Sequence, residues 1–170
     1  MRKKPYINVE IDQLTNSIVN VISGDVFETE FFKVTKKEIE LKRWLFDWKY
    51  EISDKKNEVY KMTIKENSKV IQGLLSLQPR EGHVFINLVE NAKFNRGKQK
   101  MYLGVGGNMF AFACKRSMEL GFEGYVGFDA KTSLINYYHS TLGAQRAIGN
   151  RMFIDNVASA KLIMQYFKNE

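Results

Sequence analysis

The stretch that decides the fold runs from Tyr102 to Phe128 and reads YLGVGGNMFAFACKRSMELGFEGYVGF. It opens with glycines that permit a tight turn, because a residue without a Cβ atom adopts backbone angles that other residues avoid. These glycines are Gly104, Gly106 and Gly107. The mainly apolar residues from about 108 to 120 predict a helix packed on a sheet, and Gly121 is typical of a helix end. Residues 125–128 predict a short strand.

The start of this helix predicts an anion site. Unpaired backbone N–H groups lie at a helix N-terminus, and the helix dipole favours negative charge there. The segment before the turn, residues 83–90, reads HVFINLVE and predicts a strand. The unit is therefore strand, loop, glycine turn, helix, strand. It indicates a place for the pyrophosphate of a cofactor, and a tight turn without any ligand is the alternative interpretation.

Two segments resemble motifs of the GNAT superfamily, the acyl-CoA-dependent N-acyltransferases. Residues 101–106, MYLGVG, resemble the family pattern Arg/Gln-x-x-Gly-x-Gly/Ala at both glycines, but Met101 stands in place of the leading Arg or Gln. Basic residues just upstream, at positions 98 and 100, are candidates to supply the missing charge. Residues 136–144, NYYHSTLGA, resemble the family helix that ends in Phe-Tyr-x-x-x-Gly-Phe, with Ala144 replacing the last Phe. The resemblance extends over about residues 59–167.

The resemblance implies an α/β fold of GNAT type. Its mixed, mostly antiparallel sheet is split near strands 83–90 and 125–128, and helices cover both faces. The chain would be one domain, residues 1–170, with an acyl-CoA-binding core at 58–170 and a variable part at 1–57 that shapes the acceptor site. The implied function is transfer of an acetyl group from acetyl-CoA to an amine acceptor, by direct attack in a ternary complex. The alternative is a non-catalytic protein of this fold that binds acyl-CoA or a macromolecular partner.

The resemblance also implies site residues. Those expected to bind the cofactor are Leu88, Val89, Gly104, Val105, Gly106, Gly107, Asn108, Thr132 and Tyr138. Tyr138 lies five positions before Gly143 and is the expected general acid, although His139, four positions before it, has the commoner spacing. A packed aromatic side chain is the alternative interpretation of Tyr138.

Glu90 closes strand 83–90 and is the expected general base, able to deprotonate an amine through water. An exposed carboxylate at the end of a strand is the alternative. Strict alternation along this strand predicts that the side chains of Val84, Ile86 and Leu88 lie on the same face of the sheet as Glu90.

Composition narrows the function classes. The 170 residues include 26 basic and 19 acidic side chains, a net charge of +7 that favours an anionic partner such as coenzyme A. The basic residues are scattered, which disfavours a dedicated nucleic-acid binder. The single cysteine, Cys114, excludes an internal disulfide and is expected in the core, and two histidines with one cysteine disfavour a zinc site.

No apolar run reaches the roughly 18 residues of a membrane span, and no apolar signal core follows the basic start, so a cytoplasmic protein without membrane contact is expected. A homodimer stays open, because many members of the family dimerise.

The rest of the chain predicts alternating elements. Thr35 and Glu38 form a capping-box pattern that predicts a helix over about residues 36–46. Residues 15–22 fit either a strand or a short helix, with a hairpin to the strand pattern at 26–31. Loop 91–100 either closes over phosphates or is solvated. Further strands are predicted at 6–11, 59–65, 69–77, 145–148 and 151–154, and further helices at 133–141 and from Asn156.

Overall fold

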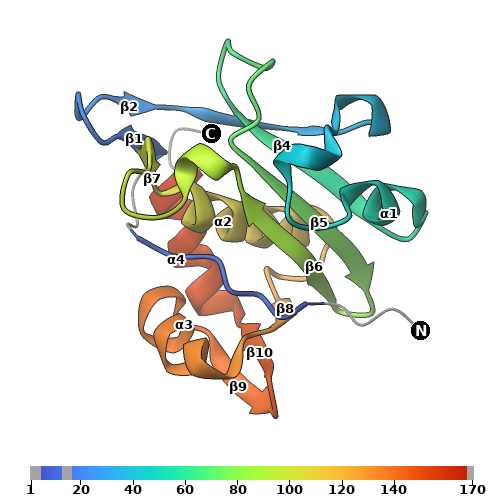
Figure 1. Cartoon of the computed structure of the whole chain (residues 1–170). Coiled ribbons are helices and arrows are strands. Elements are labelled where there is room, and N and C mark those ends of the chain that lie inside the picture. Colours follow the sequence, from blue (N-terminus) through green and yellow to red (C-terminus); the bar gives the residue numbers. More distant parts are fainter. Residues whose placement is uncertain (1–4, 13–16, 168–170) are drawn as a thin grey trace.

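The computed structural model describes residues 5–12 and 17–167, and Figure 1 shows the arrangement of their helices and strands. Seven strands form the main sheet, in the order β3-β4-β5-β6-β8-β10-β9. Among the described strands of this sheet only β6 and β8 pair in parallel, so the mixed, mostly antiparallel sheet predicted from the sequence is confirmed. The strands are β3 (Thr29–Lys33), β4 (Glu58–Ile64), β5 (Gly73–Arg80), β6 (His83–Asn91), β8 (Val126–Asp129), β9 (Gln145–Ile148) and β10 (Arg151–Ile154).

Helices cover both faces of this sheet, as predicted. α2 (Val105–Glu119) and α4 (Asn156–Phe167) pack into the larger apolar core, which also receives side chains of α3 (Ile135–Leu142). α1 (Trp48–Ser53) covers the other face through a second core around Trp48, Leu74 and Leu88. None of the helices in the described part of the chain combines the length and apolar character needed to cross a bilayer.

The N-terminal part adds a small second sheet, in the order β2-β1-β7. Its strands are β1 (Ile18–Asn20), β2 (Val26–Phe27) and β7 (Tyr102–Leu103). The hairpin between β1 and β2 confirms a strand rather than a helix at 18–20, while positions 15 and 16 of that predicted element lie outside the described residues. The predicted strand at 69–77 begins only at Gly73.

The helix predicted at 36–46 is wrong. Two short 3-10 helices, Lys36–Glu38 and Leu41–Arg43, lie there instead. The capping box is present, because the Thr35 N–H donates to the Glu38 carboxylate at 2.8 Å. The backbone N–H groups of Leu45 and Phe46 donate to the buried Glu90 carboxylate instead of to helix carbonyls. A tertiary partner therefore replaces the helix that the local pattern predicts.

The alternation predicted along β6 is also wrong. Ser76 of β5 pairs with Leu88 but Leu77 pairs with Ile86, so Asn87 is an unpaired bulge. Because of this extra residue, the side chains of β6 that follow Asn87 point to the face opposite to the one predicted by strict alternation. Val84, Ile86 and Val89 lie in the larger core beside α2, whereas Leu88 lies in the α1-side core.

Candidate acyl-donor site

The sheet opens between β6 and β8. The two strands pair at only three positions, ending at Ile86↔Phe128, after which β6 continues to Asn91 and β8 stops at Asp129. We call the region beyond this last pair the split. In Figure 1, residues 5–12 run as a dark blue segment between α2 and β6 on one side and α3 on the other. The split is therefore occupied by the chain's own N-terminal segment, and the following contacts fix its position.

Residues 5–12 extend the sheet and complete the core. The Ile7 N–H donates to the Asp129 carbonyl at 2.7 Å, and the Lys131 N–H donates to the Ile7 carbonyl at 3.0 Å, which makes a parallel bridge beside Ala130. The side chains of Ile7, Val9 and Ile11 are buried in the larger core. The sequence predicts a strand at 6–11, but this single bridge is its only ladder contact among the described residues.

The glycine turn receives a carboxylate from this segment. Gly104 precedes α2 with φ +91°, a left-handed angle that favours glycine. Its N–H donates to the Asp12 carboxylate at 2.9 Å. Lys100 Nζ donates to the same carboxylate at 3.0 Å and to Glu10 at 2.8 Å. A negative group thus lies at the helix start, as the sequence predicts, but it belongs to this chain.

Lys100 stays charged in this cluster. Burial lowers the pKa of its amine, but the hydrogen bonds to Glu10 and Asp12 outweigh this effect, and the net pKa is raised. Loop 91–100, for which two interpretations were open, therefore contributes a cation to the split.

Gly106 is required by a close approach of the backbone. A Cβ atom at this position would lie 2.5 Å from the Glu10 carbonyl oxygen and 3.1 Å from the Val9 side chain. The residues around it, Val105, Gly107 and Asn108, are also buried. Asn108 is held by Thr29, whose hydroxyl donates to it at 2.9 Å.

Tyr138 faces the split, and His139 does not. The Tyr138 hydroxyl donates to the Val9 carbonyl at 2.6 Å, and its side chain is fully buried. Burial raises the pKa of the Tyr138 phenol, with a smaller contribution from Tyr137. The Tyr137 hydroxyl accepts the Ile11 N–H at 2.6 Å. His139 Nδ1 instead lies 2.8 Å from the Ala144 carbonyl.

Glu90 lies on the opposite side of the sheet. Its carboxylate accepts from the Leu45 N–H at 2.8 Å, the Phe46 N–H at 3.2 Å and the Trp48 indole at 2.9 Å. Only 3% of the residue is exposed, so the alternative interpretation of Glu90 as an exposed carboxylate at the end of a strand is wrong. The bulge at Asn87 turns this side chain toward α1, where it holds the covering segment in place.

The remaining positions predicted to bind the cofactor lie in different parts of the structure. Val89 is buried in the core beside α2, but Leu88 faces the α1 side. Thr132 is exposed in the short 3-10 helix Thr132–Leu134 and accepts from Asn150 Nδ2 at 2.8 Å. The structure thus brings the glycine turn and Tyr138 together around residues 5–12, and leaves Leu88, Glu90 and Thr132 elsewhere.

Sequence reasoning missed the residues that fill the split: Val9, Glu10, Ile11 and Asp12. Asp12 and Gly104 are 92 positions apart, and no local pattern joins them. In this arrangement the residues do not fit acetyl-CoA, because the glycine turn already holds Asp12 and the backbone of Glu10 lies against Gly106. Across the described residues, no group of three or more His, Cys, Asp and Glu side chains is placed to hold a metal ion.

No protein-family model and no curated protein matches the sequence. The chain is similar in structure to AtaTR bound with AcCoA, with a TM-score of 0.54 and 12% identity over 79% of this chain and 98% of that one. It is also similar to a Bacillus subtilis acetyltransferase in complex with CoA, with a TM-score of 0.49 and 15% identity over 76% of this chain and 98% of that one.

A further similar structure is the ribosomal-protein-S18-alanine N-acetyltransferase from Escherichia coli, with a TM-score of 0.44 and 11% identity over 74% of this chain and 90% of that one. The likeness to AtaTR shows the fold, and the GNAT-like architecture predicted from the sequence is confirmed.

Proposed function

We propose that this protein is an acyl-CoA-dependent N-acyltransferase that acetylates an amine, and that residues 5–12 leave the split when the acyl donor binds. The observation that carries the proposal is the Asp12 carboxylate on the Gly104 N–H, beside Lys100. It supports a receptive anion site at the start of α2, where the resemblance expects a pyrophosphate. The GNAT-like fold and the likeness to AtaTR bound with AcCoA add support.

The proposal requires a closed and an open arrangement of the chain. A ligand that binds only the open arrangement must overcome the free energy that holds residues 5–12 in place, so its apparent affinity is lowered by the fraction of open molecules. The pyrophosphate of acetyl-CoA carries more negative charge than the single Asp12 carboxylate that it would replace. Lys100 and the Gly104 N–H belong to loop 91–100 and to the glycine turn, so both stay in place when the segment leaves.

The side chains that face the split suit direct transfer to an amine. Tyr138 would lose its Val9 acceptor in the open arrangement, which leaves the phenol hydroxyl free to donate a proton. Direct transfer needs no covalent nucleophile, and Cys114 is buried away from solvent. Glu90 has no part in this proposal, because three donors already occupy its carboxylate. Residues 58–170 would form the donor-binding core and residues 1–57 would shape the acceptor site.

A second candidate is a non-catalytic protein of this fold, in which residues 5–12 stay in the split. It is favoured by the burial of Ile7, Val9 and Ile11 in the main core, since such a segment is costly to remove.

The two candidates are distinguished by calorimetric titration of the intact protein and of Asp12→Ala with acetyl-CoA and with free CoA. Saturable binding that is tighter for Asp12→Ala supports the acyltransferase and justifies a screen of amine acceptors. No binding by either form at about 1 mM ligand favours the non-catalytic protein.

A further inference from the structure

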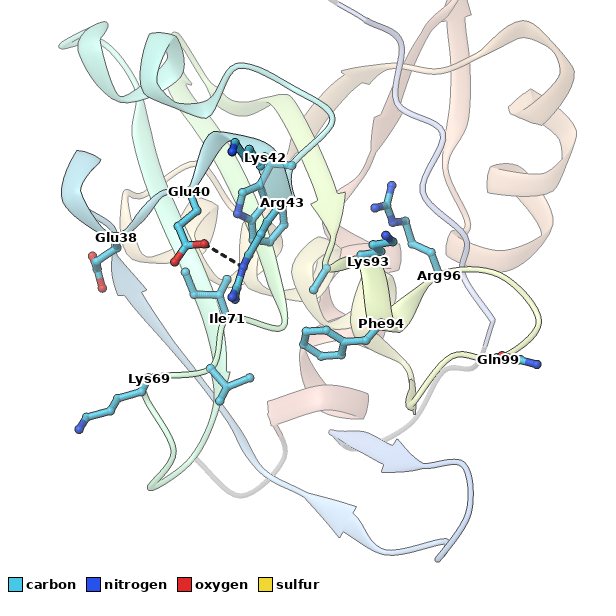
Figure 2. Close-up of a pocket in the computed structure, with 13 residues that line it drawn as sticks. Glu38, Glu40, Lys42, Arg43, Lys69, Ile71, Lys93, Phe94, Arg96 and Gln99 are labelled. Atoms are coloured by element: carbon cyan, nitrogen blue, oxygen red, sulfur yellow. Dashed lines mark ion pairs between the residues drawn. The ribbon is translucent and has the colours of Figure 1, made fainter.

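A pocket of about 780 Å³ lies apart from the split, beside the core that α1 covers. Its walls come from three segments, which are residues 38–44, the turn at 69–71 before β5, and residues 92–99 after β6 (Figure 2). The volume suits a small organic ligand. None of its lining residues hydrogen-bonds to residues 5–12 in the described structure, so the pocket does not depend on whether that segment moves.

The lining of the pocket is basic. Two acidic residues, Glu38 and Glu40, already have cationic partners, because Glu38 pairs with Lys61 and Glu40 accepts from Arg43 Nε at 3.0 Å. Four other cations line the pocket and form no ion pair with any described residue: Lys42, Lys69, Lys93 and Arg96. The pocket therefore has an excess of positive charge that attracts an anion.

Arg96 gives the most specific signal. Its Nε atom is buried from solvent and has no hydrogen-bond partner among the described residues. A buried donor without an acceptor destabilises a folded protein, so native structures seldom leave one. A guanidinium group binds phosphate or carboxylate through paired N–H donors. Because the Nε atom itself is closed to solvent, an anion in the pocket would pair with the terminal N–H groups of Arg96, which form no ion pair with any described residue.

Apolar side chains lie among the charged groups. Trp44 and Ile71 pack against the α1-side core and are half-buried, and Phe94 lines the pocket from the loop after β6. Figure 2 shows Lys93 and Arg96 projecting from that loop, across from Lys42 and Arg43, with the side chains of Ile71 and Phe94 nearby. An inorganic ion such as phosphate would not contact these apolar side chains.

We propose that the pocket binds an organic anion, in which a phosphate or carboxylate group is carried on an aromatic or aliphatic body. The anionic group pairs with Arg96 and Lys93, and the body lies against Trp44, Ile71 and Phe94. This site is distinct from the glycine turn, and it does not require the protein to be an enzyme.

The test is titration of the ¹⁵N-labelled intact protein, followed by amide NMR shifts. The probes are phenyl phosphate, phenylacetate, inorganic phosphate and the neutral benzyl alcohol. We expect saturable shifts at residues 42–44, 69–71 and 92–99 with one or both aromatic anions, and weaker binding of inorganic phosphate and benzyl alcohol. Phenyl phosphate and phenylacetate also distinguish phosphate from carboxylate recognition.

Substitutions test which basic side chains of the pocket bind the anion. Arg96→Gln and Lys93→Gln should each weaken binding of the preferred anion about tenfold, and Arg96→Lys should recover only part of the loss, because lysine keeps the charge but not the paired donors. Lys98→Gln is the matched control, since Lys98 is an exposed cation of the same loop that does not line the pocket. It should leave binding within about twofold. Melting temperatures check that each variant folds.

Three results would overturn the proposal. The first is no saturable shift with either aromatic anion up to about 10 mM. The second is equal binding of benzyl alcohol or inorganic phosphate, which would remove the need for a combined anionic and apolar ligand. The third is an equal loss for Lys98→Gln and Arg96→Gln, which would indicate net charge rather than a site.

Discussion

Replacing Asp12 with alanine should destabilise the protein and strengthen acetyl-CoA binding. The Asp12 carboxylate accepts from the Gly104 N–H at 2.9 Å and from Lys100 at 3.0 Å. Only 14% of its side chain is exposed, so solvent screens these contacts little. The same contacts are absent from the unfolded chain and from the open arrangement, and the substitution therefore favours both states relative to the closed one.

The size of both effects follows from these two contacts. Hydrogen bonds that involve charged groups contribute about 1.5–3 kcal/mol, and Lys100 keeps Glu10 as a partner, so we expect the free energy of unfolding to fall by about 1–3 kcal/mol. If the closed arrangement predominates, the same free energy lowers the apparent Kd for acetyl-CoA by about 5- to 150-fold. Urea denaturation measures the first effect and calorimetric titration measures the second.

Two variants serve as controls. Asp12→Asn keeps an amide oxygen that accepts the Gly104 N–H, so both effects should be smaller than in Asp12→Ala. Glu10→Gln removes a negative charge from a side chain that is 57% exposed and that, among the described residues, pairs with Lys100 alone, so it should change stability by about 1 kcal/mol or less. A loss of stability in Asp12→Ala with an unchanged or lower affinity for acetyl-CoA would refute the competition between Asp12 and the acyl donor.

Three further predictions concern parts of the molecule outside the split. Glu90→Ala should lower the free energy of unfolding by about 3 kcal/mol, because it leaves the buried Trp48 indole N–H and the part-buried N–H groups of Leu45 and Phe46 without an acceptor. A loss below about 1 kcal/mol in urea denaturation would contradict this role. The hydrogen bonds from Arg116 hold the pKa of the Glu58 carboxyl below its ordinary value. Glu58→Gln should therefore be less stable than the native sequence at pH 7, and this difference should shrink below pH 4.5, as protonation removes the carboxylate. A difference that does not change with pH would count against the pair. Burial raises the pKa of the Cys114 thiol to about 12, so a thiol reagent should label it only after unfolding.

The parts of the fold that could be predicted from the sequence are those that local patterns determine. The meander β4-β5-β6, the glycine turn and α2 follow from apolar periodicity and from glycine positions. The bulge at Asn87 could not be predicted, because it depends on which residues of β5 pair with β6. The prediction of a helix at 36–46 was wrong for a similar reason, since the buried Glu90 carboxylate accepts hydrogen bonds from the N–H groups of Leu45 and Phe46.

The candidate site was predicted only in part. The need for glycine at Gly104 and Gly106 is real, and each has a physical cause in a left-handed angle or a close backbone contact. Residues 5–12 contact both glycines, through Asp12 at Gly104 and through Glu10 at Gly106. The alternating pattern of this segment resembles that of an ordinary strand. Nothing in that pattern states where the strand docks, because its contacts with α2 and α3 cross about 90 to 130 positions of the chain.

Amide hydrogen exchange with and without acetyl-CoA tests the central claim most directly. The backbone N–H groups of Ile7, Ile11 and Lys131 form hydrogen bonds that help to hold residues 5–12 in the split. Saturating acetyl-CoA should speed exchange at these amides and slow it at residues 104–108. Binding of acetyl-CoA that leaves residues 5–12 equally or better protected would contradict the claim that this segment occupies the donor site.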